Sequence, residues 1–191
     1  MRHAERGIAF LRVVVGLWFL KGLFTKLGVT LALGVVPLPV ASDRWIATMP
    51  VLLGRYAAEN PFPWYRSFLL DVVVPEPAFA HLTALGEVAV GLSLTFGVLT
   101  GLGAALGALQ VAGYGLAVQH MSPAQQGFHL MLLAMMLTFV WTRAGRTWGV
   151  DGWLASRAPV HRGARHRLAL AGRGGRTTTI DLTRGSHDHT R

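Results

Sequence analysis

The chain has 191 residues, of which 52% are hydrophobic and 14% charged, and this charged fraction is well below the ~25% of an average soluble domain. It contains no cysteine, which excludes disulfides, thiolate metal sites, iron–sulfur ligation, covalent c-type haem and any persulfide intermediate on this chain. The formal charge of +9 would suit nucleic acid in a soluble protein, but no nucleic-acid motif accompanies it, and we expect no such partner.

Four apolar stretches are long enough to cross a bilayer, which requires about 20 mostly apolar helical residues. We place these spans at residues 8–28, 78–99, 101–119 and 126–143. The first lacks a signal-peptide cleavage site and leads into Lys21 and Lys26, so we expect it to stay attached. The predicted fold is therefore an all-α integral membrane protein, a four-transmembrane-helix bundle.

Arginine and lysine close to the membrane ends predict the orientation of the bundle. Three arginines lie before or just inside the first span, and ten follow the fourth against three aspartates, which gives that end a net charge of +7. Residues 28–77 carry three arginines and four acidic residues, a net charge of −1. We therefore expect both termini to be cytoplasmic, segment 28–77 to be external, and the protein to reside in the inner (cytoplasmic) membrane.

The external segment 28–77 holds seven of the nine prolines and so cannot be one long helix. From Pro63 to Val74 large apolar residues recur at helical spacing, with Ser67 and Asp71 opposite them. This pattern predicts a short amphipathic helix on the outer interface, where tryptophan and tyrosine are common. It serves either as a packing cap over the bundle or as a lid or docking surface for an extracytoplasmic partner.

Residues 1–154 form the predicted membrane domain, and residues 155–191 form a basic tail with little apolar periodicity. We expect this tail to be disordered unless a partner or anionic lipid orders it. Its His187 and His189 are a weak metal signal, and we predict no metal site. Small-xxx-small patterns such as Gly103/Gly107 and Ala104/Ala108 indicate close helix packing, either within the bundle or against another subunit.

Ionisable residues within a span are costly and are therefore candidates for function. They are Lys21, Lys26 and Glu87. At ~1.5 Å per residue, Lys21 lies about 20 Å from the cytoplasmic start of its span and Glu87 about 13 Å from the outer start of its own, similar depths in a ~30 Å core. A lysine–glutamate pair between the first two spans is thus expected, either as a structural ion pair that fixes helix register or as part of a polar pocket.

Histidines gather at the same outer end of the bundle and support the pocket interpretation. His81, His120 and His129 map to the outer ends of spans two, three and four, and Tyr114 lies below His120. Such a group can hydrogen-bond a quinone headgroup and exchange protons, because histidine titrates near neutrality and quinone reduction consumes protons. Bis-histidine haem ligation is an alternative, and each histidine alone is also compatible with an interfacial position.

Several short motifs are shared with a known membrane family. They are Leu11-Arg12-Val13-Val14-Val15-Gly16 followed by Gly22 and Lys26; Trp64-Tyr65-Arg66-Ser67-Phe68 with Val74-Pro75; Glu87 with Gly91; Gly97-Val98-Leu99-Thr100; and Gly145-Arg146-Thr147-Trp148-Gly149-Val150-Asp151. Together they resemble the DoxX/DoxD family, which includes the small DoxD-type membrane subunit of thiosulfate:quinone oxidoreductase. The resemblance covers about residues 8–154, and its motifs specify the family better than the reaction.

The resemblance implies a four-helix membrane protein associated with quinone-linked oxidoreductases. It makes Lys26 and Glu87 the first-choice polar residues of the site, whereas depth in the membrane alone favours Lys21 as the lysine partner of Glu87. Our expected function is a DoxX-like subunit of a quinone-linked oxidoreductase complex. The candidate cofactor is a non-covalently bound quinone near Glu87, Lys26, Lys21, His120 and His129. The rival is a non-catalytic accessory subunit of a larger respiratory or photosynthetic membrane complex. Membrane lipids and other complex subunits are the expected partners, and whether the chain is itself catalytic stays open.

Overall fold

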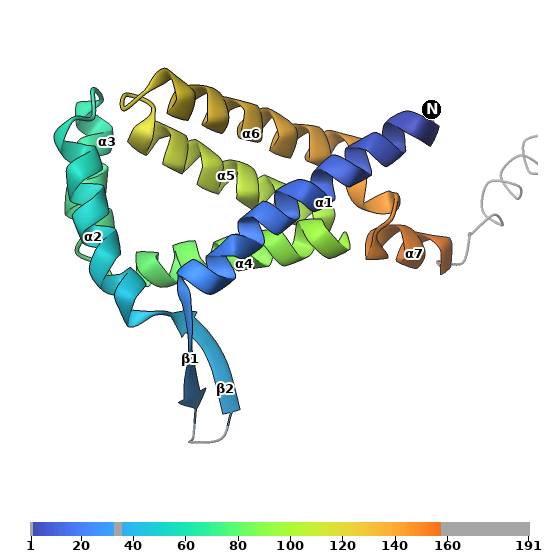
Figure 1. Cartoon of the computed structure of the whole chain (residues 1–191), viewed down its shortest axis with the longest axis horizontal. Helices are drawn as coiled ribbons and strands as arrows, with labels where there is room; N and C mark the ends of the chain where they lie inside the picture. The colour runs from blue at the N-terminus through green and yellow to red at the C-terminus, as the bar shows by residue number, and fades with distance from the viewer. Residues whose placement is uncertain (1, 33–35, 158–191) are drawn as a thin grey trace, which may run out of the picture. The chain divides into compact units, whose positions relative to one another are not determined.

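Four helices in the described part of the chain are long and apolar enough to cross a membrane (Figure 1). They are α1 (Arg2–Thr25), α4 (Ala78–Phe96), α5 (Thr100–Val118) and α6 (Pro123–Thr142). The computed structural model describes residues 2–32 and 36–157. Most of the predicted basic tail, including His187 and His189, lies outside the described residues. The described residues are mainly helical, with four helices suited to a multi-pass membrane protein.

The helix ends differ from the predicted spans where local backbone chemistry overrides hydropathy. α4 ends at Phe96 because Gly97, with φ of 68°, adopts the left-handed conformation that commonly terminates a helix. α5 begins three residues later at Thr100. α1 ends at Thr25 because the chain turns into a β-strand at Leu27.

Consecutive long helices pack antiparallel through glycines on their facing sides. A Cβ atom on Gly91 of α4 would lie 2.8 Å from the backbone nitrogen of Leu20 in α1. Likewise, a Cβ on Gly107 of α5 would lie 2.9 Å from a Val90 methyl of α4. Gly107 therefore packs within the bundle, as one of the two interpretations of the small-residue pattern expects, and the helix backbones approach closely.

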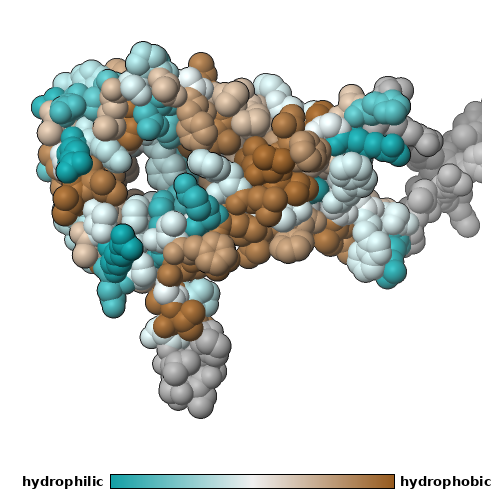
Figure 2. Space-filling view, viewed as in Figure 1, coloured by the Kyte–Doolittle hydropathy of each residue, from teal (hydrophilic) through white to brown (hydrophobic). Residues whose placement is uncertain are grey.

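The bundle is apolar outside as well as inside. The core contains residues such as Phe19, Leu94 and Phe139, yet Leu109 and Leu130 on the outside are 72% and 67% exposed. Figure 2 shows hydrophobic side chains across the middle of the visible face, between more hydrophilic ends. Contiguous apolar exposure on this scale is unfavourable in water and suits a surface covered by lipid.

A β-hairpin, β1 (Leu27–Ala32) and β2 (Val36–Ala41), follows α1 and departs from the all-α prediction. The strands pair antiparallel from Leu27 opposite Ala41 to Ala32 opposite Val36. Pro37 and Pro39 cannot donate backbone hydrogen bonds, but residues two apart face the same way, so both can turn their nitrogens to the free edge of β2. The prolines that exclude a helix are therefore compatible with this edge strand.

The rest of the segment before α4 is helical: α2 (Asp43–Ala58), α3 (Pro63–Ser67) and the π-helical turn η1 (Phe68–Val73). Tyr65, Leu69 and Val73 are buried at four-residue intervals and join a second core with residues of α2, α4 and α5. Trp64 and Phe68 are exposed. The apolar residues predicted to form a single face thus divide between a buried face and an exposed one.

Two short elements complete the described residues: the 3₁₀ turn η2 (Ala144–Arg146) and α7 (Val150–Arg157). The bundle therefore has two distinct ends. We call the end where α1 meets the β-hairpin and α4 begins the hairpin end. We call the other, with the α4–α5 turn, η2 and α7, the turn end.

Candidate functional site

An ion pair joins α1 to α4 towards the hairpin end. The Lys26 Nζ lies 2.5 Å from the Glu87 Oε1, and the two side chains are only 17% and 12% exposed. Glu87 lies near the middle of α4, and Lys26 directly follows α1. Gly22 makes room for the pair, because a Cβ there would lie 2.7 Å from the Glu87 Oε2. The antiparallel packing of these two helices thus brings a lysine from one beside a carboxylate of the other.

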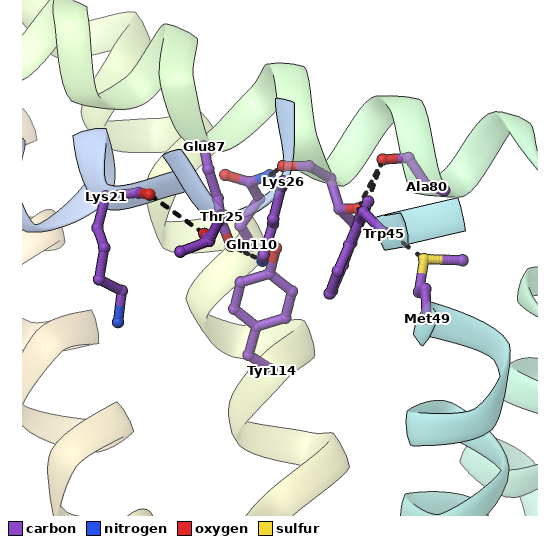
Figure 3. A network of polar contacts seen from close by, with 10 residues as sticks. Lys21, Thr25, Lys26, Trp45, Met49, Ala80, Glu87, Gln110 and Tyr114 are labelled. Carbon is purple, nitrogen blue, oxygen red and sulfur yellow. Dashed lines mark hydrogen bonds and ion pairs between the residues drawn. The ribbon is translucent and has the colours of Figure 1, made fainter. Parts of the chain in front are cut away.

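Aromatic side chains surround the ion pair (Figure 3). The Tyr114 hydroxyl of α5 donates to the same Glu87 oxygen at 2.9 Å. The Lys26 ammonium lies 4.3 Å from the centroid of the Trp45 ring and 5.4 Å from that of Tyr114, within the range of cation–π attraction. Trp45 is held in turn, because its indole Nε1 donates to the Ala80 carbonyl at 3.2 Å. We call Lys26, Trp45, Glu87, Gln110 and Tyr114 the Glu87 site.

Gln110 belongs to this site and leaves one acceptor free among the described residues. It lies one helical turn before Tyr114 on α5. Its Nε2 donates to the Thr83 carbonyl at 3.4 Å, whereas its buried Oε1 has no hydrogen-bond partner. A buried acceptor without a partner is costly, so a water or ligand donor is favoured here.

A cavity of ≈ 470 Å³ opens beside Trp45, where a ligand can lie next to the site. This volume falls within the ~300–1,000 Å³ typical of small-molecule sites. Trp45 lines this cavity and also contacts Lys26, so it connects the two. The cavity is lined by Phe24, Thr25, Leu27, Ser42, Arg44, Trp45 and Thr48.

Lys21, the lysine favoured by depth counting, does not join the site. It is exposed, and its Nζ lies 4.4 Å from the centroid of the Trp18 ring. Figure 3 shows its side chain pointing away from Glu87. The structure therefore pairs Glu87 with Lys26, the position that the family resemblance favours.

None of the three histidines hydrogen-bonds Glu87 or Lys26 in the described residues. His129 and His81 each place Nδ1 near a carbonyl of their own helix region, Gln125 at 2.8 Å and Pro77 at 3.1 Å. Both ring nitrogens of His120 are buried without a partner in residues 2–32 and 36–157. In those same residues the hydrogen bonds of the Glu87 carboxylate come from Lys26 and Tyr114, and no group of three or more potential ligands forms a metal site.

A second polar cluster lies at the turn end around Arg12, which is 0% exposed. Its Nη2 donates to the Trp148 carbonyl at 3.0 Å. The carboxylate of Asp151 accepts the backbone amides of Leu99 at 2.8 Å and Thr100 at 2.9 Å. Two motifs of the family resemblance, residues 97–100 and 145–151, therefore form one structural unit, which we call the Arg12 cluster.

Electrostatics favour the charged form of Asp151. Burial alone would raise its pKa, but hydrogen bonds from Thr100 and Leu99 and the charge of Arg12 outweigh burial and hold the pKa below its ordinary value. The sequence indicated Arg12 as one of the orienting charges and as part of a shared motif, but not as a buried residue. Its position within an apolar helical run was the available signal that it would be buried.

No family model matches this chain, and comparisons with curated proteins and with solved structures also return no match. The DoxX/DoxD resemblance accordingly remains a prediction from short motifs. The Glu87 site is therefore the main structural indication of function in the described residues.

Proposed function

We propose that this chain is a DoxX-like integral membrane subunit of a quinone-linked oxidoreductase, in which the Glu87 site receives the quinone headgroup. The observation that carries the proposal is a shielded lysine–glutamate pair that is hydrogen-bonded by Tyr114, lies within a mainly apolar bundle and is next to a cavity. Charged groups among membrane helices are costly and are usually retained for a function.

The donors and acceptors of the site match the chemistry of a quinone. When bound, a quinone supplies two carbonyl oxygens that take up two electrons and two protons. Lys26 and Tyr114 are donors able to hydrogen-bond such an oxygen, and Glu87 can exchange a proton with them. The chain has no cysteine to hold an iron–sulfur cluster, so the electrons would come from a bound cofactor or from a partner subunit.

The cavity beside Trp45 is lined by both apolar and polar residues, as a lipophilic ring with polar oxygens requires. Phe24 and Leu27 provide apolar surface, and Arg44 and Thr48 provide polar groups. A headgroup in this cavity lies against Trp45, whose ring also contacts Lys26. The donors Lys26 and Tyr114 do not line the cavity, so the proposal requires Trp45 to move for them to reach the headgroup.

The proposal also includes the orientation of the bundle in the membrane. The charge asymmetry of the sequence favours cytoplasmic termini in the inner membrane, with the hairpin end external. The exposed Trp64 and Phe68 then lie at the external interface. A tag inserted near Ala58 should be accessible without permeabilisation, and labelling of that tag only after permeabilisation would reverse the orientation.

The rival proposal is a non-catalytic accessory subunit of a respiratory or photosynthetic complex. It is favoured by the fact that Lys26, Glu87 and Tyr114 already satisfy one another. In that role the ion pair fixes the register of α1 against α4, and the exposed apolar faces contact other subunits.

The deciding experiment measures quinone retained after purification in mild detergent. We expect quinone in the wild-type protein and a loss of up to about tenfold in Tyr114→Phe, which removes a neutral hydrogen bond worth ~0.5–1.5 kcal/mol. A similar loss is expected in Glu87→Gln, because the carboxylate then no longer positions Lys26 and Tyr114. Glu59→Gln changes an exposed glutamate and is the matched control. Folded wild-type protein without quinone, or equal retention in all variants, would favour the accessory role.

A further inference from the structure

A second cavity, of ≈ 270 Å³, lies at the turn end, away from the Glu87 site. It is formed where the start of α5 and the end of α6 meet η2 and α7. Its lining residues are Gly101, Val140, Arg143, Arg146, Asp151 and Ala155. The proposed quinone function leaves this cavity unexplained.

The cavity has two cationic side chains that are available to a ligand. Arg143 and Arg146 are exposed, and in residues 2–32 and 36–157 the ion pair identified is Lys26–Glu87, so neither arginine is paired with a carboxylate there. The carboxylate of Asp151 also lines the cavity, but both of its oxygens accept backbone amides, from Leu99 and Thr100. The two arginines therefore make the cavity suitable for an anion.

Apolar and aromatic side chains lie next to these arginines in the chain. Trp148, Trp153 and Leu154 are all more than half exposed. The Arg157 guanidinium lies 3.8 Å from the centroid of the Trp153 ring, which keeps a further cation beside this aromatic surface. Tryptophan and leucine combined with arginine at the end of membrane-spanning helices are typical of the boundary between headgroups and acyl chains.

The backbone gives the two arginines defined positions. Arg143 has φ of 49° and caps α6, with its amide donating to the Phe139 carbonyl. The Arg146 amide donates to the Arg143 carbonyl at 3.0 Å. Arg143 and Arg146 therefore belong to one tight turn directly after α6, and the ends of membrane-spanning helices are the level at which lipid headgroups are found.

We propose that this cavity binds the phosphate of an anionic phospholipid, with Arg143 and Arg146 as its ligands and the acyl chains along the apolar end of α6. Charge complementarity selects an anion, because a zwitterionic lipid brings its own cation to the site. The adjoining Trp148, Trp153 and Leu154 select a lipid over free phosphate, since they contact acyl and glycerol groups that inorganic phosphate lacks.

The test uses the full chain in mild detergent and measures retained lipid by native mass spectrometry. Protein is mixed with equal amounts of phosphatidylglycerol and phosphatidylcholine. We expect wild type to retain phosphatidylglycerol preferentially, and Arg143→Gln and Arg146→Gln each to lower this retention about tenfold, the effect of ~1.4 kcal/mol. Arg55→Gln, which removes an exposed arginine of α2, is the matched control and should retain the wild-type preference.

Further arms distinguish other sources of the same signal. All variants keep the arginine-rich tail, so binding by the tail contributes equally to each. Equal retention of the two lipids by wild type, or unchanged phosphatidylglycerol retention in an Arg143→Gln/Arg146→Gln double variant, would overturn the proposal. Displacement of lipid by millimolar inorganic phosphate would instead show a free-anion site. Loss of a co-purifying protein from the variants, with lipid retention unchanged, would show a protein-binding site.

If the glutamine variants fail to fold, the wild-type protein still tests the proposal. A photoactivatable phosphatidylglycerol should crosslink to residues 141–155, and Arg143→Lys should keep part of the preference because it keeps the charge. Crosslinks confined to other segments would contradict the site. None of these measurements involves quinone, so this proposal and the proposed function can fail separately.

Discussion

The Glu87 site and the Arg12 cluster both shield charge between membrane helices, but the partners of the charged groups differ, and the buried Nε and Nη1 of Arg12 have no hydrogen-bond partner among the described residues. Glu87 is held by side chains, Lys26 and Tyr114. Arg12 donates to a backbone carbonyl, and Asp151 accepts backbone amides. Side chains can rotate to accept a ligand, whereas backbone groups hold loops in place. We infer that the side-chain partners at the hairpin end can be exchanged for a ligand, whereas the side chain-to-backbone hydrogen bonds of the Arg12 cluster hold the turns at the turn end in a fixed conformation.

Backbone strain supports this division. Three non-glycine residues in residues 2–32 and 36–157 have positive φ, Leu99, Arg143 and Trp148, and all belong to the turn end. Each such conformation costs ~1–2 kcal/mol. Leu99 and Trp148 bond directly to Asp151 and Arg12. Arg12 and Asp151 thus stabilise turns that are unfavourable by themselves.

The largest expected effect on stability comes from Gly97→Ala, which disrupts the packing of the turn end. Gly97 has φ of 68°, and an added Cβ would collide with the Arg12 guanidinium and lie 2.6 Å from Gly149 Cα. Left-handed strain and overpacking together predict a loss of ~2–5 kcal/mol in the free energy of unfolding. Thermal unfolding in detergent measures this loss. Gly127→Ala, whose Cβ meets nothing within 4 Å, is the control, and similar unfolding of the two variants would contradict the locking role.

The next prediction breaks the ion pair of the Glu87 site. Glu87→Gln or Lys26→Met leaves one shielded charge without its partner, and we expect up to about 3 kcal/mol of destabilisation, at the low end for buried pairs because both groups are slightly exposed. The double variant should recover part of this loss. Lys21→Met is the lysine control and should change stability little.

Unfolding measurements on these four variants check the assignment of the pair. A wild-type unfolding midpoint in both single variants would mean that Lys26 and Glu87 are not coupled. If Lys21→Met is the most damaging change, the depth argument was correct and the observed pairing is not the important one.

Comparison of Lys21 with Lys26 shows what the sequence could have predicted. Val15, Phe19, Gly22 and Lys26 recur every three or four residues, so they lie on one face of α1, and Lys21 falls on another. Depth counting ignored this rotation. The helical period alone would have chosen Lys26, and hydropathy alone located the four long helices.

Other features depend on tertiary contacts that no local pattern specifies. Trp45 reaches the Glu87 site because α2 packs on α4, and Gln110 enters it from the third spanning helix. The β-hairpin was not predicted because the prolines at positions 37 and 39 exclude one long helix without indicating a strand, and only pairing with β1 makes their segment an edge strand.

A smaller effect is the dependence of the stability of the turn end on pH through Asp151. The pKa of Asp151 is lower in the folded protein than its ordinary value of 3.8, so its stabilising contribution is present above that value and is lost as pH falls through the folded pKa. Asp151→Asn should cost ~1.5–3 kcal/mol at pH 7, the worth of hydrogen bonds to a charged group. The difference from wild type should shrink below pH 3.8, and a difference that persists at the lowest pH would show that charge is not the cause.

The smallest expected change in stability comes from Gly22→Ala, which tests whether the Glu87 site is adjustable. A Cβ at Gly22 would lie 2.7 Å from the Glu87 Oε2, so the carboxylate must move. Overpacking costs ~1–3 kcal/mol, but alanine gains ~1 kcal/mol of helix propensity, which leaves a net loss of roughly 0–2 kcal/mol. Gly7→Ala in the same helix meets nothing within 4 Å and should show only the gain. The Gly22→Ala variant should unfold slightly earlier than Gly7→Ala and retain much less quinone, because a displaced carboxylate no longer positions Lys26 and Tyr114. Quinone retention equal to that of Gly7→Ala would show that the geometry of this carboxylate does not matter for binding.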